Sequence, residues 1–130
     1  MCVKVRASQG IIYTRSTATV YTNKAEHRRM RWGVPYGLNI LSNMRSDKFD
    51  TTWKGLSVNR CVLSVESFFE KQHEFVGMEP LLLACLYTAN NQFAILTGPS
   101  DKLVSPYHNR MPIIISMDIV TGKQIGRAHV

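Results

Sequence analysis

The second residue of the chain, Cys2, has a distinctive chemistry because it directly follows Met1. Removal of Met1 would leave an α-amine and a thiol on adjacent carbons. An α-amine has a pKa of about 7.7–8.0, so a useful fraction is neutral near pH 7 and can attack an aldehyde to form an imine. The thiol can then close a five-membered thiazolidine. A ring-opened abasic deoxyribose carries such an aldehyde and suits this pair; a cysteine without a chemical role is the alternative.

A basic and aromatic stretch follows. Residues 24–31 include Arg28, Arg29 and Arg31, and residues 32–37 (WGVPYG) combine aromatic side chains with the glycine and proline that are typical of a loop. Basic charge beside an aromatic loop suits nucleic acid. A solubilising excess of charge is the alternative for the basic residues of the chain.

The composition indicates one globular domain with an anionic partner. The chain has 130 residues, 45% of them hydrophobic, and a formal net charge of +7. Such a charge favours nucleic acid through counterion release. No apolar run is long enough to cross a bilayer, and residues 1–4 lack the apolar core of a signal peptide. We therefore expect a cytoplasmic, nucleoid-associated protein with no membrane partner and no obligate protein partner.

The cysteines and histidines predict neither disulfides nor a metal site. The three cysteines are an odd number, widely separated, in a chain without an export signal. Cys61 and Cys85 lie in apolar runs, so we expect small buried hydrophobic residues there. None of the four histidines stands at zinc-ligand spacing from a cysteine. We predict no cofactor.

Most of the expected elements are strands. Residues 11–21 predict a strand or hairpin, residues 59–69 a buried strand that leads into a turn, and residues 93–97 and 112–116 two further strands. Residues 81–87 are apolar throughout, so periodicity leaves a strand and a short helix open. The predicted class is α+β, rich in strands, with short helices.

Several segments, in order, resemble the motifs of the SRAP (SOS response-associated peptidase) family. They are residues 32–35 (WGVP), 43–47 (NMRSD), 60–63 (RCVL), 68–70 (FFE), 84–87 (ACLY), 93–97 (FAILT) and 108–112 (HNRMP). The resemblance runs from Met1 to about Ser116. It implies a mixed or antiparallel, barrel-like sheet and a protein of the DNA damage (SOS) response. It also implies binding of single-stranded DNA with abasic sites, a covalent crosslink at the N-terminal cysteine, and lyase and self-processing activity.

Carried over residue by residue, the resemblance assigns four catalytic residues. Cys2 would be the nucleophile, and Asn43 would hold its amine or the opened sugar by hydrogen bonds. Glu70 would move protons, a role that suits a carboxyl group whose pKa is raised by the two phenylalanines before it. His108 would be the second acid–base group, with a reference pKa of about 6.5. A solvated carboxylate and a surface histidine are the alternatives for the last two.

The resemblance and the charge pattern also imply DNA-binding side chains. Arg45 would meet phosphate, and Trp32 and Pro35 would stack on bases or separate them, since stacking is worth about 1–3 kcal/mol per base. The predicted set is Lys4, Arg31, Trp32, Pro35, Arg45 and Arg110. Lys4 stands where the family usually has arginine, so it keeps the charge without the bidentate fork. A core anchor is the alternative for Trp32.

The domain is predicted to span residues 1–124. The resemblance implies that the C-terminal part of the family domain is missing, which would leave the barrel incomplete. Residues 125–130 (IGRAHV) resemble the translation of a sequencing adapter and are predicted to be a non-native tail.

Two other functions stay open. An N-terminal cysteine peptidase or amidohydrolase would use the same amine and thiol on an amide carbonyl, with an oxyanion hole. A non-catalytic single-stranded DNA-binding module would result if Val3, in place of the family's usual glycine, and the missing C-terminal part of the family domain had disabled the chemistry.

Overall fold

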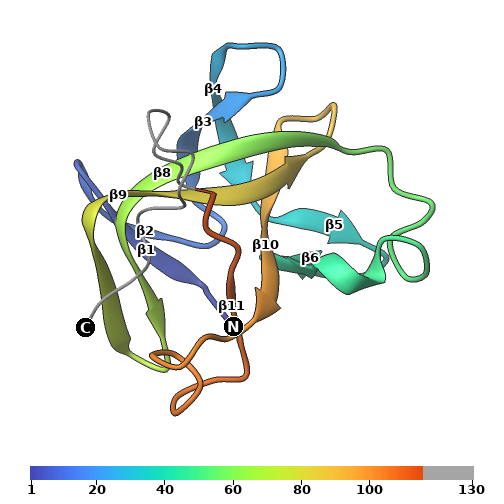
Figure 1. Ribbon diagram of the computed structural model, residues 1–130. Helices are drawn as coiled ribbons and strands as arrows, with labels where there is room; N and C mark the ends of the chain where they lie inside the picture. The colour runs from blue at the N-terminus through green and yellow to red at the C-terminus, as the bar shows by residue number, and fades with distance from the viewer. Residues whose placement is uncertain (116–130) are drawn as a thin grey trace, which may run out of the picture.

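The computed structural model describes residues 1–115, which are built almost entirely from strands (Figure 1). The strands are β1 (Lys4–Ala7), β2 (Gly10–Tyr13), β3 (Thr17–Thr22), β4 (His27–Trp32), β5 (Val34–Tyr36), β6 (Asn39–Leu41), β7 (Asn43–Arg45), β8 (Asn59–Glu70), β9 (His73–Tyr87), β10 (Gln92–Pro99) and β11 (Arg110–Pro112). One 3-10 helix, η1 (Ser46–Lys48), is the only helical element of the described residues. The β-rich prediction is confirmed, whereas the predicted α component is wrong for residues 1–115.

Strand pairing explains why a segment that could have been a short helix is a strand. The apolar residues 81–87, for which the sequence left strand and helix open, belong to the long strand β9, which pairs with β8 on one side and β10 on the other. Side chains on both faces of residues 81–87 are buried or half-buried, so no period-2 alternation is required.

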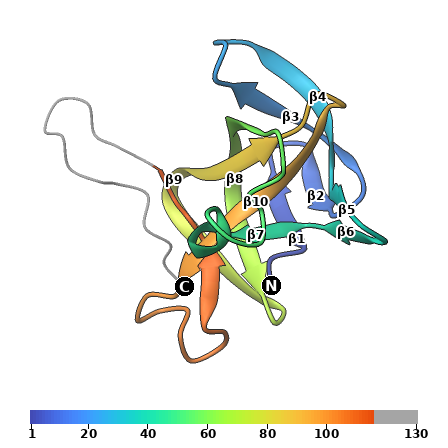
Figure 2. The same cartoon turned by 90° about the vertical axis from the view of Figure 1, so that its right-hand side faces the viewer.

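Most strands form one mixed sheet, and β5 and β6 form a separate two-stranded sheet. In the mixed sheet the order is β11-β10-β4-β3-β8-β1-β2, β4 and β7 run parallel to β10, and β9 pairs with both β8 and β10. The pairings β10-β4-β3-β8-β9-β10 therefore form a closed circuit. Side chains from all five of these strands meet in one hydrophobic core, and the two views in Figures 1 and 2 show the strands curving around it.

Alternation along β3 and β4 divides the basic stretch between two faces. Ala18 and Val20 on β3, and Met30 and Trp32 on β4, are buried, and their neighbours along each strand point away from the core. Residues 27–31 are therefore not one continuous basic cluster.

A register shift in β8 determines the direction of Glu70. Alternate residues from Cys61 to Val65 face the core, and the pairing with β9 then shifts between Val65 and Ser67. Beyond this irregularity Phe68 and Glu70 face inward. Without it, Glu70 would have the outward orientation of the exposed even-numbered residues at the start of the strand, because a one-residue slip reverses every side chain.

The hairpin between β8 and β9 closes immediately after Glu70, which pairs with His73. Lys71 and Gln72 form the two-residue loop with φ values of 47° and 69°. Two left-handed residues are the pattern of a type I′ turn, which matches the twist of a hairpin but usually selects asparagine and glycine. Non-glycine side chains in this region cost about 1–2 kcal/mol each.

An ion pair and strand pairing hold the N-terminal strand beside this hairpin. Val5 of β1 pairs with Phe68 of β8. The Arg6 guanidinium donates to both carboxylate oxygens of Glu74, at 2.6 and 3.3 Å, and the Ser67 hydroxyl contacts the same carboxylate at 2.5 Å. These contacts bring the start of the chain to the end of β8 that carries Glu70.

Gly33 lets the chain pass from β4 to β5. Its φ is 147°, and a Cβ atom there would lie 2.6 Å from Cγ2 of Ile40. A side chain at this position would be strained in its backbone and blocked by β6. The backbone conformation and the close approach of β6 therefore explain the glycine of the WGVP segment. The next strand after β6 is β7, which carries Asn43.

Candidate functional site

The backbone of Cys2 is clamped by the side chain of Asn43. The Cys2 N–H donates to Asn43 Oδ1 at 2.8 Å, and Asn43 Nδ2 donates to the Cys2 carbonyl at 2.7 Å. Asn43 is fixed in turn because β7 pairs with β10, where it lies opposite Ile95. The contact is made to the nitrogen that would become the α-amine if Met1 were removed.

Two acid–base groups converge on the N-terminal amine that the chain carries. The Met1 nitrogen lies 2.9 Å from Glu70 Oε1 and 3.1 Å from His108 Nε2. The structure thus brings Cys2, Asn43, Glu70 and His108 together from β7, β8 and the loop before β11, although they are separated by as many as 106 positions in the sequence.

Glu70 is fully buried. Burial raises the pKa of its carboxyl group, and the positive charge of the nearby Met1 amine, followed by that of His108, opposes the rise. Apart from the ion pair with this amine, neither carboxylate oxygen has a hydrogen-bond partner among the described residues. A buried carboxyl group with spare acceptor capacity next to an amine can accept and return protons.

His108 is held so that either ring tautomer has a partner. The Arg110 N–H donates to His108 Nδ1 at 3.0 Å, and the Arg110 carbonyl lies 3.1 Å from the same nitrogen. With Nδ1 as acceptor, Nε2 carries the proton; with Nδ1 donating to the carbonyl, Nε2 is free to accept one. The imidazole can therefore exchange a proton with the amine without moving.

The loop before His108 is ordered by Asp101. Its Oδ1 accepts the backbone N–H groups of Leu103 and Val104, at 3.0 and 3.1 Å, and the His108 N–H donates to the Val104 carbonyl at 3.0 Å. These bonds fix the backbone that presents the imidazole to the site.

The Cys2 thiol points into the core and is fully buried. Burial, followed by the negative charge of Glu70, raises its pKa to about 12. The thiolate is the reactive form of cysteine, so the resting thiol is a poor nucleophile at neutral pH. An amine held by Asn43 is therefore better placed to react first.

A pocket of about 390 Å³ opens beside the amine. Its lining residues are Met1, Val3, Lys4, Tyr13, Phe69, Lys71, Gln72 and His108. The Lys4 ammonium lies over the Phe69 ring, 4.5 Å from its centre, a favourable cation–π geometry. Tyr13, Phe69, Lys71 and Gln72 were not predicted. Adjacency to Glu70 could have indicated Phe69 and Lys71, whereas Tyr13 reaches the pocket only through the pairing of β2 with β1.

The arginines of the predicted DNA-binding set have different surroundings. Arg110 is half-buried and donates to the Thr97 carbonyl at 2.7 Å, so its guanidinium is tied to β10. Arg45 is exposed and forms a two-point ion pair with Asp47, at 2.8 and 3.1 Å. Arg31 is exposed and lines a depression of about 320 Å³ together with Pro35 and Arg15.

Trp32 requires a correction. Its ring is fully buried and stacks on Phe93, with ring centres 6.1 Å apart, and its indole N–H donates to the Ser42 carbonyl at 2.9 Å. A base cannot stack on a ring that is covered on all sides, so Trp32 is a core residue in this structure. The cause is the alternation of β4, which turns Trp32 inward and Arg31 outward.

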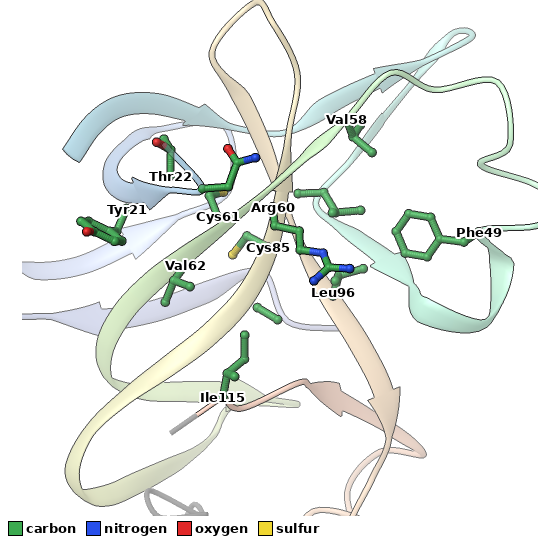
Figure 3. A pocket seen from close by; sticks show the side chains of 13 residues that line it. Tyr21, Thr22, Phe49, Val58, Arg60, Cys61, Val62, Cys85, Leu96 and Ile115 are labelled. Atoms are coloured by element: carbon green, nitrogen blue, oxygen red, sulfur yellow. The ribbon is translucent and has the colours of Figure 1, made fainter. Parts of the chain in front are cut away.

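Another pocket, of about 730 Å³, lies away from this site over β8, β9 and the segment after β7 (Figure 3). Its lining is mainly apolar and includes none of the four predicted catalytic residues. Cys61 and Cys85 are among its lining residues and are buried free thiols, as expected. Within residues 1–115, no group of three or more His, Cys, Asp or Glu side chains could hold a metal ion, and no helix is long and apolar enough to cross a membrane.

The strand-rich architecture is shared with a known structure. A phage-related protein from Bordetella bronchiseptica, solved by crystallography, superposes with a TM-score of 0.61 at 16% identity, covering 88% of this chain and 76% of that one. At this identity the likeness concerns the fold alone. None of the curated protein sequences matches the chain.

The sequence identifies the family. The model of the SOS response associated peptidase (SRAP) family matches residues 3–121. The chain therefore belongs to the SRAP family, as its motifs predicted. Membership associates it with the response to DNA damage and with DNA in general terms.

Proposed function

We propose that this protein binds single-stranded DNA and captures abasic sites covalently through Cys2, once Met1 has been removed. The observation that carries the proposal is the convergence of Asn43, Glu70 and His108 on the first two residues of the chain. Membership of a DNA-damage family supports DNA as the partner.

The proposed reaction begins at the amine. The Cys2 nitrogen attacks the aldehyde carbon of the opened sugar, and the resulting carbinolamine loses its hydroxyl group as water to give an imine. The buried carboxyl of Glu70, whose pKa is raised by burial, protonates the departing hydroxyl. His108 accepts the proton that the amine gives up.

The thiol then completes the product. Cys2 Sγ attacks the imine carbon, and the thiol proton moves to the imine nitrogen, so that aldehyde and aminothiol become a thiazolidine and one water. The raised pKa of the thiol fits this order, because the thiol need not react until the electrophile is beside it. Lyase activity and self-processing of the N-terminus, which the family resemblance implies, are proposals that go with this site.

Removal of Met1 is the first requirement. Its amine occupies the position between Glu70 and His108, and while it is attached the Cys2 nitrogen is an amide and cannot form an imine. Intact mass of the purified protein checks this step: a mass lower by one methionine is expected.

Incubation with matched abasic and intact oligonucleotides, read on a denaturing gel, separates the candidate functions. We expect a heat-stable shifted band with abasic DNA only. Release of a peptide or amide product without a shifted band would favour the peptidase or amidohydrolase. Binding on a native gel without a shifted band would favour the non-catalytic module.

A further inference from the structure

The outer face of the hairpin formed by β3 and β4 carries an unusual concentration of positive charge. Arg29 and Arg31 alternate with buried residues on β4 and are both exposed. Arg15, in the turn before β3, is exposed as well and lines the same depression as Arg31. We call these three side chains the arginine face.

The charges of this face are not neutralised by the protein. Among residues 1–115, none of the three arginines takes part in an ion pair. Residues 17–32 contain one acidic residue, Glu26, and it pairs with Arg28. The neighbours of the face on β3 are hydroxyl side chains: Thr17 lies opposite Arg31 and Thr19 opposite Arg29. The Thr17 hydroxyl accepts a hydrogen bond from Arg29 at 2.6 Å.

Arg28, on the same strand, differs from the arginine face because its charge is neutralised within the protein. It points to the other face of β4, where its guanidinium pairs with Glu26, reaches Asn91 Oδ1 at 3.3 Å and lies over the Tyr87 ring, 5.7 Å from its centre. Arg28 and Arg29 are adjacent on β4 but have different surroundings. Arg28 is neutralised by Glu26, whereas Arg29 has no acidic partner among the described residues and is open to an external anion.

The arginine face is joined to the Cys2 site by a short segment. Tyr13 lines the pocket beside the N-terminal amine, and Arg15, two residues later, lines the depression that contains Arg31. Backbone hydrogen bonds hold this segment in place, from Thr14 N–H to the Val3 carbonyl at 2.9 Å and from Arg15 N–H to the Trp32 carbonyl at 2.7 Å. Both depressions thus border the segment from residue 13 to residue 15.

We propose that the arginine face is a second binding surface for the DNA strand, which it holds by its phosphates on one side of the captured nucleotide. Arg15 and Arg31 line one depression, and Arg29 lies two residues from Arg31 on the exposed side of β4. Exposed cations beside hydroxyl groups suit a phosphate backbone without base recognition. The placement of an abasic nucleotide at Cys2 depends on the proposed function, whereas phosphate binding by the arginine face does not.

The test compares variants of adjacent residues on one strand. Binding of an intact single-stranded oligonucleotide is measured by fluorescence anisotropy over a range of salt concentrations for the wild type, Arg29→Ala, Arg28→Ala and Arg29→Ala/Arg31→Ala. Each lost phosphate contact reduces the slope of log K against log salt by about 0.7 for single strands. The double variant should lose about 1.4 in slope, Arg29→Ala about half of that, and Arg28→Ala nothing. Arg29→Lys/Arg31→Lys should keep the slope.

A second measurement tests the one-sided arrangement. Adduct formation is compared for abasic oligonucleotides with a flank of about eight nucleotides on the 5′ side only or the 3′ side only, a length within the usual site size of single-strand binding surfaces. The wild type should prefer one flank, and the double variant should lose that preference.

An unchanged slope in the double variant, an equal loss in Arg28→Ala, or a flank preference that survives in the double variant would overturn the inference. Failure of the proposed function looks different: the wild type would form no adduct with any flank, while the anisotropy comparison would still decide the role of the arginine face.

Discussion

Glu70 has opposite effects on stability and on the proposed chemistry. Its pKa is raised by burial, so the folded protein holds this proton more tightly than the unfolded chain does. The contribution of this group to stability is therefore greatest below the unfolded value, near the ordinary 4.5, and falls as pH rises through the raised folded value. A neutral side chain of the same shape would avoid this loss and could not transfer the proton.

Glu70→Gln should separate these two effects. The difference in unfolding midpoint between variant and wild type should grow in favour of the variant as pH rises from about 4.5. Adduct formation should slow by about 10²–10⁴-fold, the usual contribution of general acid–base catalysis. Thermal melts over a pH series and gel time courses measure the two quantities. A variant that loses stability as pH rises in parallel with the wild type would show that Glu70 is not the group responsible.

Asn43 should act by positioning the nitrogen of Cys2. Asn43→Ala removes both bonds to the Cys2 backbone, and a misplaced nucleophile costs on the order of 10²-fold in rate. Asn43→Asp keeps an acceptor for the nitrogen but has no amide N–H for the Cys2 carbonyl, so it should be less impaired. The measurement is the rate of adduct formation at saturating DNA. Equal rates for Asn43→Ala and the wild type would remove Asn43 from the mechanism.

At the scale of elements, the turn after Glu70 combines a strained backbone with an exposed position in the pocket. Lys71 and Gln72 adopt left-handed conformations, and both line the depression beside the amine. Lys71→Asn/Gln72→Gly provides the residues that a type I′ turn favours, so it should raise the free energy of unfolding by about 1 kcal/mol. Chemical denaturation measures this change. Destabilisation would mean that the two side chains make contacts worth more than the strain they cause.

Some of the strands could be predicted from the local composition of the sequence. The residues of β8 and β10 were identified as strands because β-branched and aromatic side chains are concentrated there. The inward orientation of Glu70 was not predictable, because it depends on the register shift between Val65 and Ser67. The only signal in the sequence is the change of phase from Cys61, Leu63 and Val65 to Phe68.

The candidate site could also be predicted only in part from the sequence. Asn43, Glu70 and His108 were selected by resemblance to family motifs, and the fold brings them to one end of the chain. Charge pattern alone misjudged the basic stretch, because it could not show that β4 separates Arg28 from Arg29 or that Trp32 turns into the core. Alternation along a strand resolves such choices only when its register is known.

At the scale of the whole molecule, the positive charge is not evenly spread. Ion pairs engage Arg6, Arg28 and Arg45, whereas the arginine face and the lysines of the pocket beside Met1 have no ion pair among the described residues. This distribution leaves free cations around the N-terminal site and on one neighbouring surface, which is the arrangement that an extended anionic strand requires. The predicted domain end at residue 124 and the predicted tail of residues 125–130 lie outside the described residues.

The central claim is that Cys2 forms the bond to DNA with both its amine and its thiol, and one comparison tests it most directly. Wild type and Cys2→Ala, each confirmed by mass to lack Met1, are incubated with an abasic oligonucleotide with and without borohydride, heated and run on a denaturing gel. The wild type should give a heat-stable adduct in both conditions. Cys2→Ala keeps the amine but cannot close the ring, so its adduct should appear only when borohydride reduces the imine. A heat-stable adduct of Cys2→Ala at the wild-type level without borohydride would contradict the mechanism, because it would show that the thiol is not needed for a stable bond.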